Sequence, residues 1–164
     1  DSASIFLTQE AMSHVMTEGT GRSAYNRVPA SVRLTGKTGT TNDLRDSWFA
    51  GFSDDLVAVA WVGRDDNGRT RLTGATGALQ VWSAFMGEAH PQSLSAVPPS
   101  GIVKAWADPA TGLGSDPSCV GSIEIPFRQG YEPLPGPGCR PVIDTEALQD
   151  GANKVLDTIR GWLR

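Results

Sequence analysis

The sequence of 164 residues predicts an α/β (α+β) fold in which an antiparallel sheet is flanked by helices. Three neighbouring segments between residues 32 and 63 carry the apolar patterns of strands, and short polar turns separate them. Short connections favour antiparallel pairing, because parallel strands need a long crossover. On either side of these strands, apolar residues recur at helical spacing and predict the flanking helices.

The first helix is expected from about residue 8 to residue 18. Thr8 is the expected N-cap, Glu10 lies in the first turn, and Gly19 supplies the stop. The apolar stripe of this helix, which we expect to pack in the core, consists of Met12, Val15 and Met16.

The strand segments come next. Residues 32–41 alternate before and through a Gly-Lys-Thr-Gly-Thr-Thr string, and two more apolar runs follow at 48–52 and 56–62. The pair Asp54 and Asp55 between these runs predicts a hairpin turn. It does not predict a metal site, because no further carboxylates converge in the local sequence.

A second helix is expected from about residue 75 to residue 89, packed on the sheet through residues at helical spacing: Leu79, Trp82, Phe85 and Met86. Residues 90–101 then shift to Pro, Ser and Gln. Prolines remove backbone donors and fix φ, so this stretch predicts a linker and a domain boundary.

Beyond the linker, residues 102–164 predict a small C-terminal extension. Short strands are expected at 102–107 and 122–127, with a turn at 108–112 that has Pro in its second position. An amphipathic helix is expected at 144–163. The predicted organisation is therefore a domain over 1–89, a linker over 90–101 and the extension.

Composition excludes several functions. The formal charge is −4 without a basic run, which argues against nucleic acid or an anionic membrane surface as a partner. No apolar stretch is long enough to span a membrane, and no signal peptide is present. The two cysteines form no C-x-x-C and have no histidine nearby, so no metal site and no cofactor are predicted.

Residues 36–41 carry the main functional signal, with one cation, three hydroxyls and two glycines. Such a string suits the binding of an anion. It matches the end of a phosphate-binding P-loop, but Ser31 stands where that motif requires glycine. Residues 39–43 are also a poor helix start, and a P-loop must open a helix. The better match is the Lys-Thr-Gly element of penicillin-interacting serine enzymes, which lies on a strand.

The surrounding sequence resembles the end of the transpeptidase domain of bifunctional class A penicillin-binding proteins. The positions that match in this run are Thr41, Asn42, Asp46, Trp48, Phe49, Ala50, Gly51, Trp61, Val62, Gly63 and Asp65. Two glycine-containing strings match as well, at 18–21 and 74–78. The resemblance covers roughly residues 1–88. It extends more loosely into the tail, which is most similar to the 1B type.

One departure from the family is large. The family's S-x-x-K and Ser-x-Asn motifs are both absent; the nearest strings are at 23–26 and 40–42. In the family both motifs precede Lys-Thr-Gly. We therefore expect the chain to be a C-terminal fragment whose serine nucleophile and lysine base lie upstream, on the same longer polypeptide.

The resemblance implies a peptidoglycan D,D-transpeptidase. Such an enzyme transfers an acyl group from D-Ala–D-Ala stem peptides through an acyl-serine, and β-lactams imitate the dipeptide. It also implies a longer protein with a glycosyltransferase domain and a membrane anchor, working at the periplasmic face of the bacterial inner membrane. The alternatives are a D,D-carboxypeptidase or serine β-lactamase, and, for the tail, a non-catalytic module that docks a periplasmic regulator. The match past Trp48 and the long tail argue against the first two.

The resemblance also assigns roles. Thr38 and Thr40 share one face of a strand, where both hydroxyls can bind the substrate carboxylate. Lys37 has the other parity and makes the site electropositive, and the Thr40 N–H is one oxyanion donor. Gly39 is expected to keep the edge of the strand open to the substrate. Gly36 is expected to let this edge begin without a side chain in the cleft.

The tail carries one further expectation. A periplasmic location implies oxidised thiols, so Cys119 and Cys139 are expected to form a disulfide. Two free thiols would fit a cytosolic protein instead.

Overall fold

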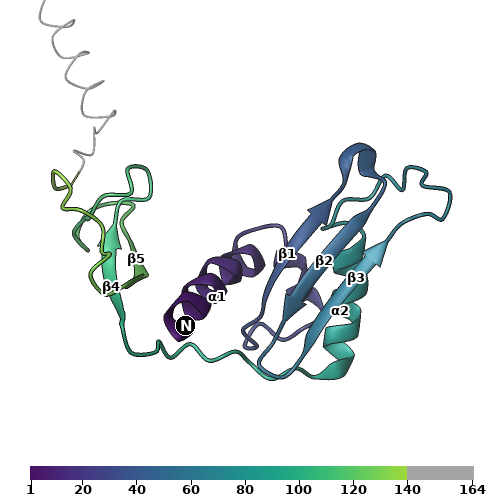
Figure 1. Cartoon of the computed structure of the whole chain (residues 1–164), viewed down its shortest axis with the longest axis horizontal. Coiled ribbons are helices and arrows are strands. Elements are labelled where there is room, and N and C mark those ends of the chain that lie inside the picture. The colour runs from purple at the N-terminus through teal and green to yellow at the C-terminus, as the bar shows by residue number, and fades with distance from the viewer. Residues whose placement is uncertain (140–164) are drawn as a thin grey trace, which may run out of the picture. The chain divides into compact units, whose positions relative to one another are not determined.

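The structure is a computed structural model that describes residues 1–139, and the chain divides into two compact units, Asp1–Ile102 and Val103–Arg164 (Figure 1). The amphipathic helix expected at 144–163 lies outside the described residues.

The first unit is built on an antiparallel sheet. Its strands are β1 (Thr35–Thr40), β2 (Ser47–Phe52) and β3 (Val57–Val62), in the spatial order β1-β2-β3. Adjacent strands pair antiparallel in an unbroken register. The expected fold class, a mixed α/β arrangement with an antiparallel sheet and flanking helices, is confirmed.

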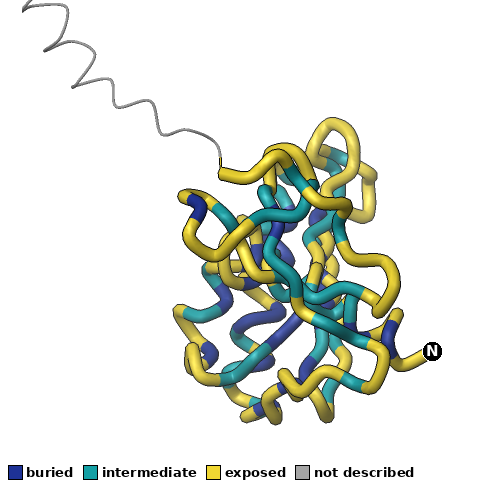
Figure 2. Tube along the Cα trace, turned by 90° about the vertical axis from the view of Figure 1, so that its left-hand side faces the viewer, coloured by how far each residue is buried: buried dark blue, intermediate teal, exposed yellow. Residues whose placement is uncertain are grey.

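Helix α2 (Ala78–Ala89) covers one face of the sheet (Figure 1). The Trp82 ring packs on Phe49 of β2, with ring centroids 4.8 Å apart, and its Nε1 donates to the Ala58 carbonyl at 3.1 Å. Buried and exposed positions alternate along β2, and Figure 2 colours the trace of the chain by burial. The core of the unit consists of Met16, Ala24, Val28, Leu34, Phe49, Ala60, Ala78, Leu79, Trp82 and Met86.

Helix α1 (Ser2–Thr17) contacts β1 and begins earlier than the sequence predicts. Asp1 is the N-cap, and its carboxylate accepts from Ser4 N at 2.8 Å. The expectation that Thr8 caps the helix is wrong, because Thr8 lies inside it and its hydroxyl donates to the Ser4 carbonyl. A short 3₁₀ helix, η1 (Arg22–Asn26), follows.

Helix α2 begins at Ala78, not at the expected residue 75. The hydroxyl of Ser47, on β2, accepts from Ala78 N at 2.8 Å and donates to the Thr73 carbonyl at 2.7 Å. A distant side chain thus takes the place of a local cap. A Cβ on Gly77 would lie 2.6 Å from this hydroxyl, so the approach requires glycine.

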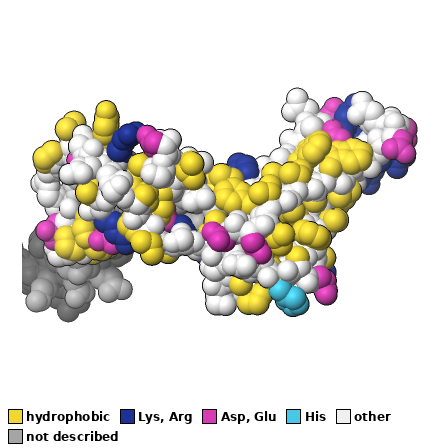
Figure 3. Space-filling model, turned by 60° about the horizontal axis from the view of Figure 1, so that its bottom comes forward, with side chains coloured by type: hydrophobic (Ala, Val, Ile, Leu, Met, Phe, Trp, Pro, Cys, Tyr) yellow, Lys and Arg dark blue, Asp and Glu magenta, His cyan; other side chains and the backbone are white. Residues whose placement is uncertain are grey.

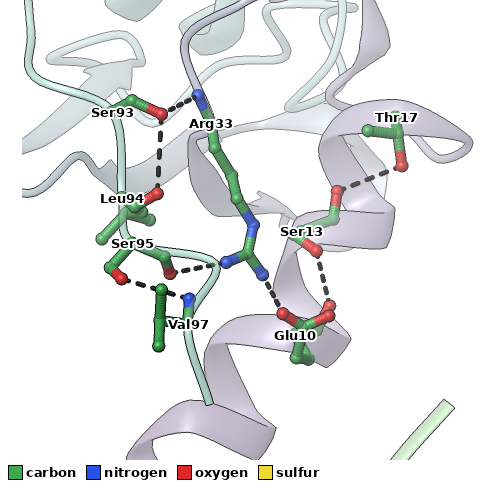
Figure 4. A network of polar contacts seen from close by, with 8 residues as sticks. All are labelled: Glu10, Ser13, Thr17, Arg33, Ser93, Leu94, Ser95 and Val97. Carbon is green, nitrogen blue, oxygen red and sulfur yellow. Dashed lines mark hydrogen bonds and ion pairs between the residues drawn. The ribbon is translucent and has the colours of Figure 1, made fainter.

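After α2 the chain crosses the first unit, where residues 93–95 form hydrogen bonds with Arg33 (Figure 4). Leu94 is buried, and its N–H donates to the Arg33 carbonyl at 3.0 Å. The Arg33 N–H donates to Ser93 Oγ, and its guanidinium donates to the Ser95 carbonyl and pairs with Glu10 of α1. The first half of the proline-rich stretch is therefore part of the packing of this unit.

A second set of contacts holds the same stretch at the hairpin between β2 and β3. The Gln92 N–H donates to the Asp55 carboxylate at 2.8 Å, and the Ser53 hydroxyl donates to it at 2.7 Å. These donors hold the pKa of Asp55 below its usual value. The turn expected at Asp54 and Asp55 thus also anchors the returning chain.

In the C-terminal unit, β4 (Ile102–Ala107) begins at the boundary and pairs with β5 (Ile123–Arg128). The Lys104 ammonium and the Glu124 carboxylate lie 3.3 Å apart on these strands. Cys119 is buried and bonded to Cys139, with Cα atoms 4.9 Å apart. This bond closes a loop over a sequence separation of 20 residues.

We predict that the protein has no titratable thiol under denaturing, non-reducing conditions. Reduction should lower the stability of the C-terminal unit by about 3 kcal/mol, because the bridge restricts the unfolded chain. Thiol counting before and after reductant measures the bond, and urea unfolding measures its effect. Two titratable thiols without reductant would contradict the prediction and the expected compartment.

Candidate functional site

The candidate site follows the outer edge of β1. Among the described strands, β1 pairs only with β2, so its other edge has no strand partner. The Gly-Lys-Thr-Gly-Thr-Thr string lies on this strand except for its last residue, Thr41, and the helix that follows, η2 (Asn42–Leu44), has only three residues. This placement agrees with a Lys-Thr-Gly strand and not with a P-loop, whose lysine opens an α-helix.

The two threonine hydroxyls that the sequence singles out have separate partners. Thr38 Oγ1 lies 2.9 Å from Thr20 Oγ1, and Thr40 Oγ1 accepts from Gly74 N at 2.9 Å. The two threonines have the same parity on β1, as expected. Because Thr40 accepts from a backbone N–H, its own hydrogen is available to a further acceptor.

Lys37 has the opposite parity and pairs with Ala50 across the strands. Its side chain is exposed, and the ammonium donates to the Thr38 carbonyl at 2.8 Å. The side chain therefore bends along its own strand toward the threonines. The ammonium thus lies against the backbone of Thr38.

The two glycines of the site have packing reasons of their own. Gly36 is buried, and a Cβ there would lie 2.5 Å from Cζ of Phe49. A Cβ on Gly39 would lie 3.1 Å from Cβ of Trp48. Gly36 thus makes room for a core ring, a reason that the sequence pattern does not reveal.

The connection from β1 to β2 is closed by side-chain hydrogen bonds. Asp46 N donates to Thr41 Oγ1 at 2.8 Å, and Thr41 Oγ1 donates to the Asp46 carboxylate at 3.1 Å. The same carboxylate accepts from Nε1 of Trp61 on β3 at 3.1 Å. These bonds join all three strands at the end of β1 that carries Thr40.

Comparison with known proteins identifies the family of the chain. A scan against protein-family models finds no match. The chain is 40% identical to penicillin-binding protein 1B of Vibrio cholerae over 134 residues, which is 82% of this chain and 17% of the relative. It is 39% identical to penicillin-binding protein 1A of Pseudomonas aeruginosa, over 81% of this chain and 16% of that protein.

The chain is a homologue of penicillin-binding proteins 1A and 1B. It is also similar to a crystal structure of penicillin-binding protein 1A from Haemophilus influenzae, with a TM-score of 0.67 and 32% identity. That match covers 79% of this chain and 20% of the solved chain. The chain therefore spans about a fifth or less of the length of these relatives.

In this penicillin-binding protein homologue, the sequence pattern did not predict two contacts of the site, those made by Thr20 and by Gly74. Thr20 belongs to a Gly-Thr-Gly turn that matched the family, but nothing in the sequence places it against Thr38. Gly74 lies so close behind β1 that a Cβ would be 2.8 Å from the Gly39 carbonyl oxygen. The glycine-rich strings were the available signal, because glycine permits a close approach of two backbones.

The sheet face opposite α2 is apolar and exposed in the homologue. The register places Trp48 opposite Trp61, and Ala50 opposite Val59. The exposed large residues on this face are Trp48, Val57, Val59 and Trp61. Hydrophobic side chains gather on the surface of the first unit in Figure 3. A contiguous apolar surface of this kind is typical of a face that another structural element covers.

Two absences hold for residues 1–139. No cluster of three or more His, Cys, Asp or Glu residues that could bind a metal ion occurs there. Nor does that part of the chain contain a helix with the length and apolar character needed to cross a membrane.

Proposed function

We propose that this chain is part of a peptidoglycan D,D-transpeptidase that transfers acyl groups from D-Ala–D-Ala stem peptides and is acylated by β-lactams. In this proposal residues 1–89 are the C-terminal part of the transpeptidase domain, residues 90–101 a linker, and residues 102–164 an extension. The observation that supports the proposal is that the edge of β1 has no strand partner within residues 1–139, and that Lys37, Thr38 and Thr40 all lie on this strand.

An extended peptide or its β-lactam mimic would add to the edge of β1 as a further strand. The Thr38 and Thr40 hydroxyls would donate to the substrate carboxylate, with the Lys37 ammonium nearby to favour the anion. The Thr40 N–H would donate to the oxyanion that forms at the scissile carbonyl. Gly39, between the two threonines, would keep the approach open.

The nucleophile would come from a preceding part of the same polypeptide. The absence of S-x-x-K from the sequence and the apolar sheet face both support this assignment. We propose that the preceding part covers Trp48, Val59 and Trp61, and that the longer protein also carries a glycosyltransferase domain and a membrane anchor at the periplasmic face of the inner membrane. No cofactor is required, because a serine, a lysine and hydrogen-bond donors suffice for acyl transfer.

Labelled penicillin tests the function. The longer polypeptide should acquire one covalent label per molecule, on a serine outside these 164 residues. The present chain alone should acquire none, because it contains no S-x-x-K. Mass spectrometry of the intact protein and of its peptides measures both results, with heat-unfolded polypeptide as the control. A stoichiometric adduct on Ser31 or Ser47 of the chain alone would reject the proposal.

A further inference from the structure

Hydrogen bonds to the last turns of α1 fix the backbone of the turn that follows this helix, residues 18–21. The N–H groups of Glu18 and Gly19 both donate to the His14 carbonyl at 3.0 Å, and Gly21 N donates to the Val15 carbonyl at 2.8 Å. These bonds use the carbonyls that a helix end leaves free. The turn is therefore an extension of the helix and not a loose loop.

The glycines of this turn leave no room for a side chain. A Cβ on Gly19 would lie 2.9 Å from the Val15 Cα, and one on Gly21 would lie 2.7 Å from the Met16 sulfur. Met16 is fully buried. Thr20, between these glycines, is thus the one residue of the turn from 19 to 21 with a side chain, and its position is tied to the core.

The Thr20 hydroxyl contacts Thr38 of the candidate site. Its Oγ1 lies 2.9 Å from Oγ1 of Thr38, and both side chains are at the protein surface. Either hydroxyl can donate in this pair. When Thr38 donates to an anion, its oxygen can still accept from Thr20. Such a chain of hydrogen bonds strengthens the outer bond, because each donor polarises the next.

We propose that Thr20 is a positioning residue for the carboxylate-binding hydroxyl of Thr38. Thr20 donates to Thr38, which orients the Thr38 hydrogen toward the substrate carboxylate. This inference rests on the proposed function and adds to it a residue from a different part of the chain. Thr17, at the end of the same helix, provides a contrast because its hydroxyl donates only to the Ser13 carbonyl of its own helix (Figure 4).

Acylation kinetics of the longer polypeptide test the inference. Thr20→Val keeps the shape of the side chain and removes the hydroxyl. It should slow acylation by a penicillin with a free carboxylate by about tenfold, because the bond from Thr38 to the carboxylate loses the donor that orients and polarises the Thr38 hydroxyl. It should change acylation by the methyl ester of the same penicillin by less than about twofold, because the ester carries no anion for Thr38 to bind. Thr20→Ser should react like the wild type, and so should the matched control Thr17→Val.

A second measurement separates positioning from folding. In a Thr38→Val background, Thr20→Val should have less than about a twofold effect, because its only route to the ligand is already gone. Equal slowing of the acid and the ester, or an unchanged rate with the acid, would overturn the inference. A wild-type polypeptide that no penicillin acylates would instead reject the proposed function.

Discussion

Replacing Lys37 with alanine in the longer polypeptide should slow acylation by penicillin by a factor of about 10² to 10³. The ammonium is exposed and donates to the Thr38 carbonyl, so its loss removes the positive charge of the proposed site without opening the core. The second-order rate constant for acylation measures the effect, and the unfolding temperature shows whether the fold is intact. Lys104→Ala is the matched control, because Lys104 is an exposed strand lysine in the C-terminal unit.

The threonines of β1 belong to the same test. Thr40→Ala should slow acylation to a similar degree, whereas Thr38→Ser should have a mild effect because it retains the hydroxyl. Thr38→Val should be severe, because it leaves the carboxylate without one donor. Wild-type acylation by Lys37→Ala or Thr40→Ala would show that the site lies elsewhere.

Replacing Trp82 with alanine should lower the free energy of unfolding of the first unit by about 3 to 5 kcal/mol. Trp82 is 1% exposed, packs on Phe49 and donates to the Ala58 carbonyl. The substitution therefore leaves a cavity between α2 and the sheet and removes the hydrogen bond to the Ala58 carbonyl. Urea unfolding followed by circular dichroism measures the change.

Trp48→Ala is the control for this prediction. Trp48 has the same side chain on the same sheet, but it is 43% exposed and contacts Trp61 on the other face. Its loss should cost clearly less than the loss of Trp82, because part of its apolar surface is already in water and its removal leaves no enclosed cavity. Equal unfolding midpoints for the two variants would show that the core has been assigned to the wrong face.

The sequence by itself determined the three strands, their antiparallel order and the placement of Lys37, Thr38 and Thr40 on a strand. These features are local, because strand parity and turn chemistry act over a few residues. The relation to penicillin-binding proteins was equally visible, since it rests on motifs within one continuous run. The C-terminal strands and the turn at 108–112 followed from local signals as well.

The tertiary structure alone decided the features whose partners are distant in the chain. Helix α2 begins where Ser47 accepts from Ala78 N, 31 positions away, and no local cap marks that residue. The start of helix α1 at Ser2 is an exception, because its cap is local: the Asp1 carboxylate, and not the Thr8 hydroxyl, accepts from a free N–H, that of Ser4. The buried position of Gly36 depends on the Phe49 ring from the next strand. Thr20 reaches Thr38 across 18 positions because the turn after α1 is locked against buried Met16. A contact between two hydroxyls produces no periodic pattern in the sequence. The packing of α1 beside β1 is what brings Thr20 to Thr38.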